Sequence, residues 1–132
     1  MTIMLQRPSR RTVRALIVDD QIIIRNLLRA LLTKSGLNVV GESNSGEKAL
    51  LMAEQLKPEL ICLDITMPGI SGLETLKRLK QSHPQTKIVM ITGHQGKGDV
   101  EGAIAAGADG YIVKPFKVNT LLTTLEKIMH NN

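Results

Sequence analysis

The feature that most constrains this sequence is an alternation, from Val13 onward, of short apolar runs with longer amphipathic segments. Short runs rich in Val, Ile and Leu, without polar alternation, are typical of strands buried on both faces of a sheet. The segments between them repeat apolar residues at helical spacing, which is typical of helices that cover such a sheet. We therefore expect strands at residues 15–18, 37–41, 60–63, 88–91 and 111–113.

The intervening segments differ in how strongly they predict a helix. The last is the clearest, with apolar residues from Val118 to Met129 at helical spacing, and the first three also show such a stripe. Residues 44–47, Asn-Ser-Gly-Glu, resemble a capping box and predict the start of the second helix. The fourth segment is weak because residues 93–102 contain four glycines, and each internal glycine costs a helix about 1 kcal/mol. We expect a mobile loop there, followed by a short and marginal helix.

Five strands alternating with five helices predict an α/β fold, in which a parallel sheet is covered by helices on both faces. Right-handed crossovers between parallel strands reduce the topologies to a doubly wound, three-layer α/β/α arrangement. Sites in such sheets form beyond the carboxyl ends of the strands. The residues that follow each predicted strand are therefore the first candidates for a functional site.

Composition narrows the class of protein. The chain has 132 residues, which is enough for one domain, and we place this domain at residues 13–132 after a flexible basic tail at residues 1–12. The lone Cys62 lies in an apolar run and cannot form an internal disulfide, so we expect a buried thiol in a reducing compartment. No apolar run is long enough for a membrane span or a signal-peptide core, which favours a cytoplasmic protein without a membrane partner.

The net charge of +5 is weak evidence for nucleic-acid binding. Part of this charge comes from arginines of the tail, and the remaining Lys and Arg are spread over several segments. The sequence has no zinc-finger spacing, no aromatic RNA-binding signature and no basic region that leads into heptads. We interpret the excess as solvated surface charge and do not expect direct binding to nucleic acid.

Charged or hydroxyl-bearing residues stand at the carboxyl ends of four predicted strands. Asp19 and Asp20 follow the first strand, Asp64 follows the third, Thr92 the fourth and Lys114 the fifth. Three carboxylates on one rim of a sheet repel one another unless they take up protons or share a cation. An all-oxygen ligand set suits a hard ion such as Mg²⁺, or Mn²⁺. With a lysine and a hydroxyl beside it, the cluster fits an incoming phosphoryl group, and one carboxylate would be the nucleophile.

These residues stand in segments that resemble the response regulator receiver family over residues 13–130. The resemblance implies a flavodoxin-like fold with strand order 2-1-3-4-5, and a single-domain receiver of a two-component or phosphorelay system that is similar to the chemotaxis regulator. The matching segments are Leu16-Ile-Val-Asp-Asp20, Leu63-Asp-Ile-Thr-Met-Pro-Gly69 with Gly72, Val89-Met-Ile-Thr92, Ala106-Gly-Ala-Asp-Gly-Tyr111 and Val113-Lys-Pro-Phe116.

The resemblance assigns the phosphoryl group and the metal to particular residues. Asp64 matches the phosphoacceptor of the family, which is also a metal ligand, and Asp20 matches a direct Mg²⁺ ligand. Asp19 matches a ligand that acts mostly through water, and the backbone carbonyl of Thr66 completes the protein ligands. The chain is then expected to accept phosphoryl groups from a sensor histidine kinase or a histidine phosphotransferase. It is not expected to be an enzyme beyond its own phosphorylation and dephosphorylation.

Three further residues match the family's response to phosphorylation. Lys114 is expected to pair with the phosphoryl oxygens, Thr92 to move and hydrogen-bond them, and Tyr111 to turn inward behind Thr92. The bond between Lys114 and Pro115 is cis in the family, which directs Lys114 into the site. The fourth helix, fifth strand and fifth helix form the family's usual contact face for a downstream target protein. The protein is expected to be a monomer or a phosphorylation-dependent dimer.

Two hypotheses go beyond this pattern. His94 lies two positions after Thr92, beside the expected path of attacking water, so we expect His94 and Thr66 to tune the lifetime of the phosphoaspartate. The glycine-rich segment departs from typical family members, whose fourth helix starts with better helix formers. We expect phosphorylation to order residues 93–106 as Thr92 and Tyr111 move.

Three alternatives remain open at this point. A phosphoaspartyl hydrolase of the haloacid dehalogenase type also has a nucleophilic Asp after an apolar strand. However, its metal-binding acids usually follow the nucleophile, whereas here the acidic pair precedes Asp64. A receiver fold that only binds a partner, without phosphorylation, is disfavoured by the complete set of strand-end residues. A nucleic-acid regulator is disfavoured because only about 15 residues follow the last motif, too few for a helix-turn-helix output domain.

Overall fold

The computed structural model describes residues 12–93 and 96–130, and these form a five-stranded parallel sheet with five helices. The strand order is β2-β1-β3-β4-β5, which confirms the expected flavodoxin-like, doubly wound α/β fold. The strands are β1 (Arg14–Val18), β2 (Asn38–Ser43), β3 (Leu60–Leu63), β4 (Lys87–Thr92) and β5 (Gly110–Val113). The helices are α1 (Ile22–Lys34), α2 (Gly46–Leu56), α3 (Gly72–Ser82), α4 (Lys97–Ala105) and α5 (Val118–Met129).

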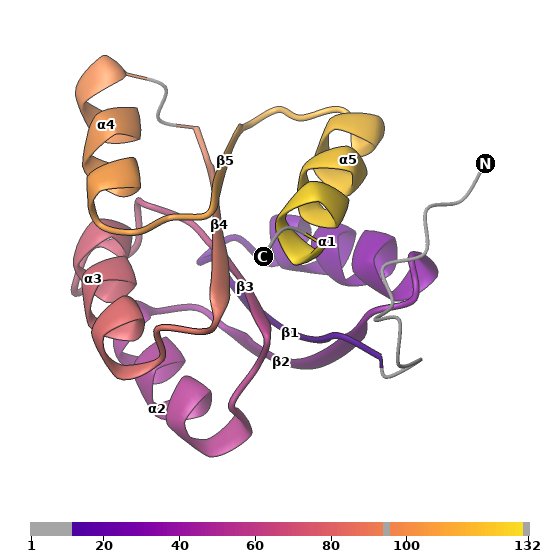
Figure 1. Ribbon diagram of the computed structural model, residues 1–132, viewed down its shortest axis with the longest axis horizontal. Coiled ribbons are helices and arrows are strands. Elements are labelled where there is room, and N and C mark those ends of the chain that lie inside the picture. The colour runs from indigo at the N-terminus through magenta and orange to yellow at the C-terminus, as the bar shows by residue number, and fades with distance from the viewer. Residues whose placement is uncertain (1–11, 94–95, 131–132) are drawn as a thin grey trace.

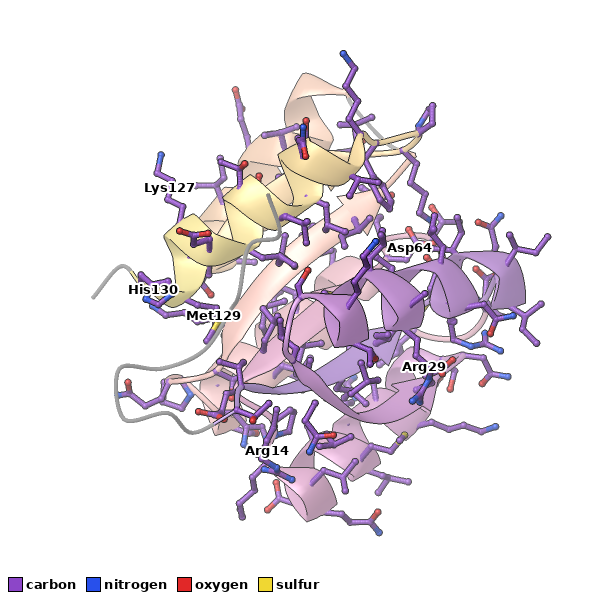
Figure 2. The ribbon with its side chains drawn as sticks, turned by 90° about the vertical axis from the view of Figure 1, so that its right-hand side faces the viewer. Arg14, Arg29, Asp64, Lys127, Met129 and His130 are labelled. Carbon is purple, nitrogen blue, oxygen red and sulfur yellow. The ribbon has the colours of Figure 1, made fainter. Side chains whose placement is uncertain are left out.

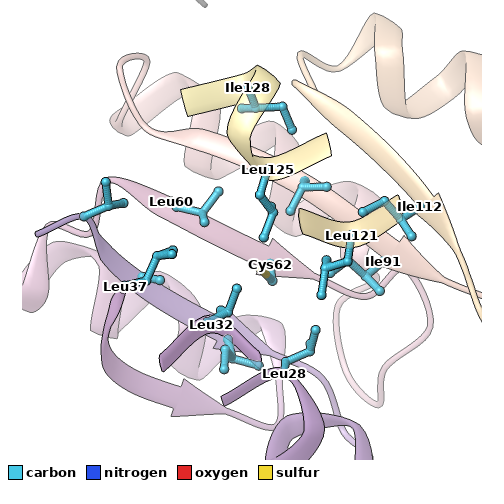
Figure 3. Packing of buried hydrophobic residues seen from close by; sticks show 14 residues of the cluster. Leu28, Leu32, Leu37, Leu60, Cys62, Ile91, Ile112, Leu121, Leu125 and Ile128 are labelled. Atoms are coloured by element: carbon cyan, nitrogen blue, oxygen red, sulfur yellow. The ribbon is translucent and has the colours of Figure 1, made fainter. Parts of the chain in front are cut away.

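The helices form two layers around the sheet. In Figure 1, α1 and α5 lie on one side of the strands, and α2, α3 and α4 lie on the other. Each layer has its own apolar core, and the core under α1 and α5 includes Cys62 between side chains of β3, α1 and α5 (Figure 3). Cys62 is buried and free, and burial raises the pKa of its thiol to about 12, so it is an inert part of the core.

The strands at the centre of the sheet match the apolar runs, but β2 extends beyond its run. We expected it at residues 37–41, whereas it spans Asn38–Ser43. The two polar residues Glu42 and Ser43 belong to the strand because they pair with Ile17 and Val18 of β1. Backbone pairing therefore sets the end of this edge strand, and hydrophobicity does not.

The predicted capping box at residues 44–47 is wrong in its register. Ser45 is the N-cap of α2, and its side chain accepts a hydrogen bond from the Lys48 N–H. Glu47 lies two residues after this cap, so its carboxylate cannot complete a box, and it accepts instead from the Ile70 N–H at 3.1 Å. The glutamate thus connects α2 to the loop between β3 and α3.

Helix α4 is short, as expected, and is the shortest helix within the described residues, but it contains two of the glycines. It begins at Lys97 and has nine residues, so Gly98 and Gly102 lie inside the helix. Among its described side chains only Ala103 is buried, whereas Ile104 is exposed. The expected mobile loop includes residues 94–95, and the basic tail includes residues 1–11, all of which lie outside the described residues.

None of the helices within residues 12–93 and 96–130 combines the length and the apolar character that crossing a membrane requires.

Candidate functional site

The backbone of the site continues the hydrogen-bond ladder of the sheet. The Asp19 N–H donates to the carbonyl of the last residue of β2 at 3.0 Å, and the Asp64 N–H donates to the last carbonyl of β1 at 3.0 Å. The Lys114 N–H donates to the carbonyl of Thr92 at 2.8 Å. Because adjacent parallel strands end at the same edge, the sheet brings all these residues to one rim.

Three carboxylates meet at this rim, as the sequence predicted. Asp19, Asp20 and Asp64 each offer an oxygen atom, and these atoms lie within 4.8 Å of one another. Asp19 and Asp64 are buried, whereas Asp20 is exposed. Such a set of hard oxygen ligands fits a divalent cation such as Mg²⁺, because repulsion between the carboxylates falls when a cation lies between them.

Lys114 supplies the positive charge of the site. Its Nζ donates to Asp19 Oδ2 at 2.7 Å and to Asp64 Oδ2 at 3.4 Å. The bond between Lys114 and Pro115 is cis, as the resemblance implied. The close contact between Lys114 and Asp19 was not predicted from the sequence, which assigned the lysine to phosphoryl oxygens alone.

Asp19 is the most enclosed acid of the three. Burial raises the pKa of its carboxyl above the ordinary value of 3.8, although hydrogen bonds from Lys114 and from the Gln21 N–H favour the ionised form. A buried carboxylate beside Asp64 is costly to ionise. The site therefore favours binding of a cation that neutralises the negative charge of these two carboxylates.

The loop after β3 carries Thr66, whose backbone carbonyl was predicted as a metal ligand. The Thr66 N–H donates to Asp64 Oδ1 at 3.4 Å, so the loop turns over the Asp64 carboxylate. Gly72 allows this turn, because a Cβ there would lie 1.9 Å from the Asp64 carbonyl oxygen. The Gly72 N–H also donates to the Ile65 carbonyl at 2.7 Å, which closes the loop.

A hollow of about 360 Å³ opens above the carboxylates, and we call it the rim hollow. A larger hollow of about 440 Å³ lies at the other end of the strands, near Arg14, Met129 and His130 in Figure 2, far from Asp64. In the part of the chain that the structure describes, the rim is the one place where three possible metal ligands meet. We therefore assign the chemistry to the rim hollow, which is lined by Asp20, Gln21, Asp64, Thr66, Thr92, Gly93 and Lys114.

The predicted switch residues lie on the β4–β5 side of the rim. Thr92 is fully buried at the end of β4. Tyr111 is half-buried against the core under α2, α3 and α4, and burial raises the pKa of its phenol above 10, with smaller contributions from Asp99 and Asp64. His94, predicted to tune dephosphorylation, lies outside the described residues, whereas Thr66 lines the rim hollow.

Sequence reasoning missed two residues that hold the acidic pair. The Gln21 N–H donates to Asp19 Oδ1 at 2.9 Å, and Arg25 Nη1 donates to the Asp19 carbonyl oxygen at 2.7 Å. Arg25 is a polar residue on an amphipathic helix, and nothing in the sequence pattern separates it from a more exposed arginine such as Arg29. Only the path of the backbone after β1 places its guanidinium against the loop.

Known proteins resemble this chain in both sequence and structure. The sequence model described as the response regulator receiver domain matches residues 15–126. Chemotaxis protein CheY from Thermotoga maritima is 36% identical over 115 residues, which are 87% of this chain and 96% of that protein. Response regulator GacA from Pseudomonas protegens is 38% identical over 117 residues, but the match covers 88% of this chain and 55% of GacA. The solved response regulator domain of Thermotoga maritima CheB has a TM-score of 0.84 and 29% identity, covering 92% of this chain and 99% of that one.

Proposed function

The chain belongs to the response regulator receiver domain family of two-component signalling, and we propose that it accepts a phosphoryl group on Asp64 with the help of Mg²⁺ or Mn²⁺. The observation that carries the proposal is the group of three carboxylates within 4.8 Å, with Lys114 Nζ in contact with two of them. Phosphoryl transfer needs little beyond positioning and the neutralisation of charge, and this rim offers both.

In the proposed reaction, a carboxylate oxygen of Asp64 attacks the phosphorus of a phosphohistidine. A new P–O bond forms while the P–N bond breaks, and its electron pair stays on the imidazole nitrogen of the donor. The carboxylates of Asp19, Asp20 and Asp64, with the Thr66 carbonyl, would hold a divalent cation, which supplies positive charge to the phosphoryl oxygens when bound. Lys114 lies 3.4 Å from Asp64 Oδ2, so it can pair with phosphoryl oxygens on that carboxylate.

The readout that we propose lies on the other side of the rim. The Thr92 hydroxyl would hydrogen-bond the phosphoryl group, and Tyr111 would move inward, which changes the face formed by α4, β5 and α5. The proposed partners are a histidine kinase or a histidine phosphotransferase as donor and a downstream protein as target. Beyond phosphorylating and dephosphorylating itself, the chain would not act as an enzyme, and its cytoplasmic location stays a prediction.

The test is the intact mass of the protein after incubation with acetyl phosphate. We expect one added phosphoryl group with Mg²⁺, and none without Mg²⁺ or in Asp64→Asn. Asp109→Asn is a matched control. Asp109 directly precedes β5, so it lies at the end of the strands away from the rim, where its Oδ2 accepts from the Ile88 N–H. This control should be phosphorylated like the wild type.

Two results would count against the proposal. Phosphorylation that survives Asp64→Asn would place the acceptor elsewhere, and repeated release of phosphate from a small phosphomonoester would favour a hydrolase. If no phosphoryl group is added at all, binding of beryllofluoride with Mg²⁺ separates the two remaining cases. A receiver that accepts only from its own kinase should bind it, and a purely structural module should not.

A further inference from the structure

The turn between β1 and α1 has to hold two acids side by side, and its local sequence provides few means to do so. Gln21, the N-cap of α1, makes no side-chain capping bond, and the first turn of the helix contains no acidic residue. Asp19 replaces the cap in part, because its Oδ1 accepts from the Gln21 N–H at 2.9 Å. This bond orients the Asp19 carboxylate, but it does not hold the peptide between Asp19 and Asp20.

Arg25 holds that peptide. Its Nη1 donates to the Asp19 carbonyl oxygen at 2.7 Å, and its Nε donates to Glu42 Oε1 at 3.2 Å. The side chain of Arg25 is 16% exposed and that of Glu42 is 23% exposed, so the pair is partly shielded from water. One guanidinium thus connects α1, the edge strand β2 and the acidic turn at the same time.

Asp20 depends most on this connection. It is exposed and immediately follows the carbonyl that Arg25 holds, so the position of its backbone decides where its carboxylate lies. We propose that Arg25, anchored by Glu42, is a positioning residue that sets the affinity of Asp19, Asp20 and Asp64 for a divalent cation. This inference rests on the proposed function, because it concerns the metal site of the same rim.

An opposite effect of Arg25 has to be weighed. A positive charge near the acidic rim repels a cation, so removal of this charge would by itself strengthen metal binding. The proposal states that the loss of geometry outweighs the loss of repulsion. Arg25→Lys separates the loss of geometry from the loss of repulsion. The lysine ammonium keeps the positive charge but lacks the planar guanidinium that reaches two acceptors at once.

The chain offers a matched control in Arg29. It also pairs with Glu42, through Oε2, but it is 47% exposed and one helical turn further along α1. Arg29 lies beside α1 in Figure 2, and within the described residues its hydrogen bond is to Glu42. Arg29→Gln therefore removes a like charge and Arg29→Lys keeps it, and neither change touches the hydrogen bond from Arg25 to Asp19.

The experiment measures the dissociation constant of Mg²⁺ by calorimetry for the wild type and these variants. We expect Arg25→Lys and Arg25→Gln to weaken binding about tenfold, equivalent to ~1.4 kcal/mol, which is within the range of a hydrogen bond to a charged group. The Arg29 variants should change it less than about twofold, as exposed ion pairs contribute little. In the metal-free protein, amide exchange at Asp20 and Gln21 should become faster only in the Arg25 variants.

Phosphorylation by acetyl phosphate provides a second readout. At saturating Mg²⁺ the Arg25 variants should regain a rate close to that of the wild type, because Asp64 and Lys114 are unchanged. A merely structural role would lower the rate at all Mg²⁺ concentrations. If an Arg25 variant does not fold, Glu42→Gln removes the charge that anchors Arg25, together with its pairing to Arg29, and leaves Arg25 itself in place. It should weaken Mg²⁺ binding by about twofold to fivefold, on the scale of one partly exposed ion pair.

The outcomes separate this inference from the proposed function. If the wild type binds no Mg²⁺, the proposed metal site fails, and the role of Arg25 fails with it. If the wild type binds Mg²⁺ and the Arg25 and Glu42 variants bind it equally well, only the inference is overturned. Tighter binding by Arg25→Gln, with no change in Arg25→Lys, would show that repulsion dominates and would also overturn it.

Discussion

The two sides of the rim are held in different ways. On the side of α1 and β2, the acidic turn is fixed by the sheet ladder, by the Gln21 N–H and by Arg25, which Glu42 anchors. On the side of β5, the N-cap of α4 is Gly96, which gives no side-chain cap, and the helix has glycines at two internal positions. Among the described side chains of α4, only Ala103 is buried.

This contrast matches a division of labour within a receiver domain. A metal and phosphoryl site needs ligands held in fixed positions, and the well-anchored side carries Asp19 and Asp20. A switch needs an element whose degree of order can change at a small cost in free energy. Elements with few buried contacts have that property. The difference between the two sides is consistent with the proposed metal site on the one and the proposed readout on the other.

The largest expected effect compares the two helices that flank β5. Leu125 of α5 is fully buried, whereas Ile104 of α4 is 63% exposed. Leu125→Ala should lower the free energy of unfolding by about 2–5 kcal/mol because it leaves a cavity in the core. Ile104→Ala should change it by no more than about 0.5 kcal/mol. Urea unfolding followed by circular dichroism measures both, and equal losses would remove the contrast between α4 and α5.

A smaller effect is expected from the glycines of α4. Within the described residues, a Cβ at Gly98 would meet no atom within 4 Å beyond the nearby backbone of its own helix, and one at Gly102 would make only an ordinary contact with Leu73 at 3.7 Å. Each change to alanine should stabilise the helix by about 1 kcal/mol. We expect slower amide exchange at residues 97–105 in Gly98→Ala and Gly102→Ala, and a smaller further slowing on phosphorylation. If phosphorylation leaves this exchange unchanged in the wild type, the expected ordering of residues 93–106 is wrong.

The smallest effect concerns Tyr111, the one tyrosine of a chain without tryptophan. Its phenol should titrate above 10 in the folded protein, first because of burial and then because of Asp99 and Asp64. The native state then keeps this proton to higher pH than the unfolded chain, so stability should fall as the pH rises above 10. Tyrosinate absorbance measures the titration directly. Asp99→Asn should lower the pKa of Tyr111 but leave it above 10, and an ordinary titration in the wild type would show that burial does not perturb the phenol.

Some of the site followed from the sequence alone. Hydrophobic periodicity predicted the five strands and the helices between them. A helix that buries one face needs apolar residues at helical spacing, and a strand that buries both faces needs a continuous apolar run. Once these elements and the crossover rule were in place, Asp19, Asp20, Asp64, Thr92 and Lys114 had to stand on one rim, because parallel strands end at the same edge. The chemistry of the rim therefore followed from local signals and one rule of topology.

The contacts that hold the rim were decided only by the tertiary structure. Lys114 reaches Asp19 across 95 positions of the sequence, and Arg25 reaches Glu42 across 17. The partner of Glu47 is an amide of the loop after β3. In place of the expected capping box, Glu47 therefore accepts a hydrogen bond from a residue 23 positions away. Such pairs depend on strand register, on helix placement and on side-chain direction to within an ångström. No short-range pattern encodes them, because the same arginine, lysine or glutamate is equally suited to a solvated surface.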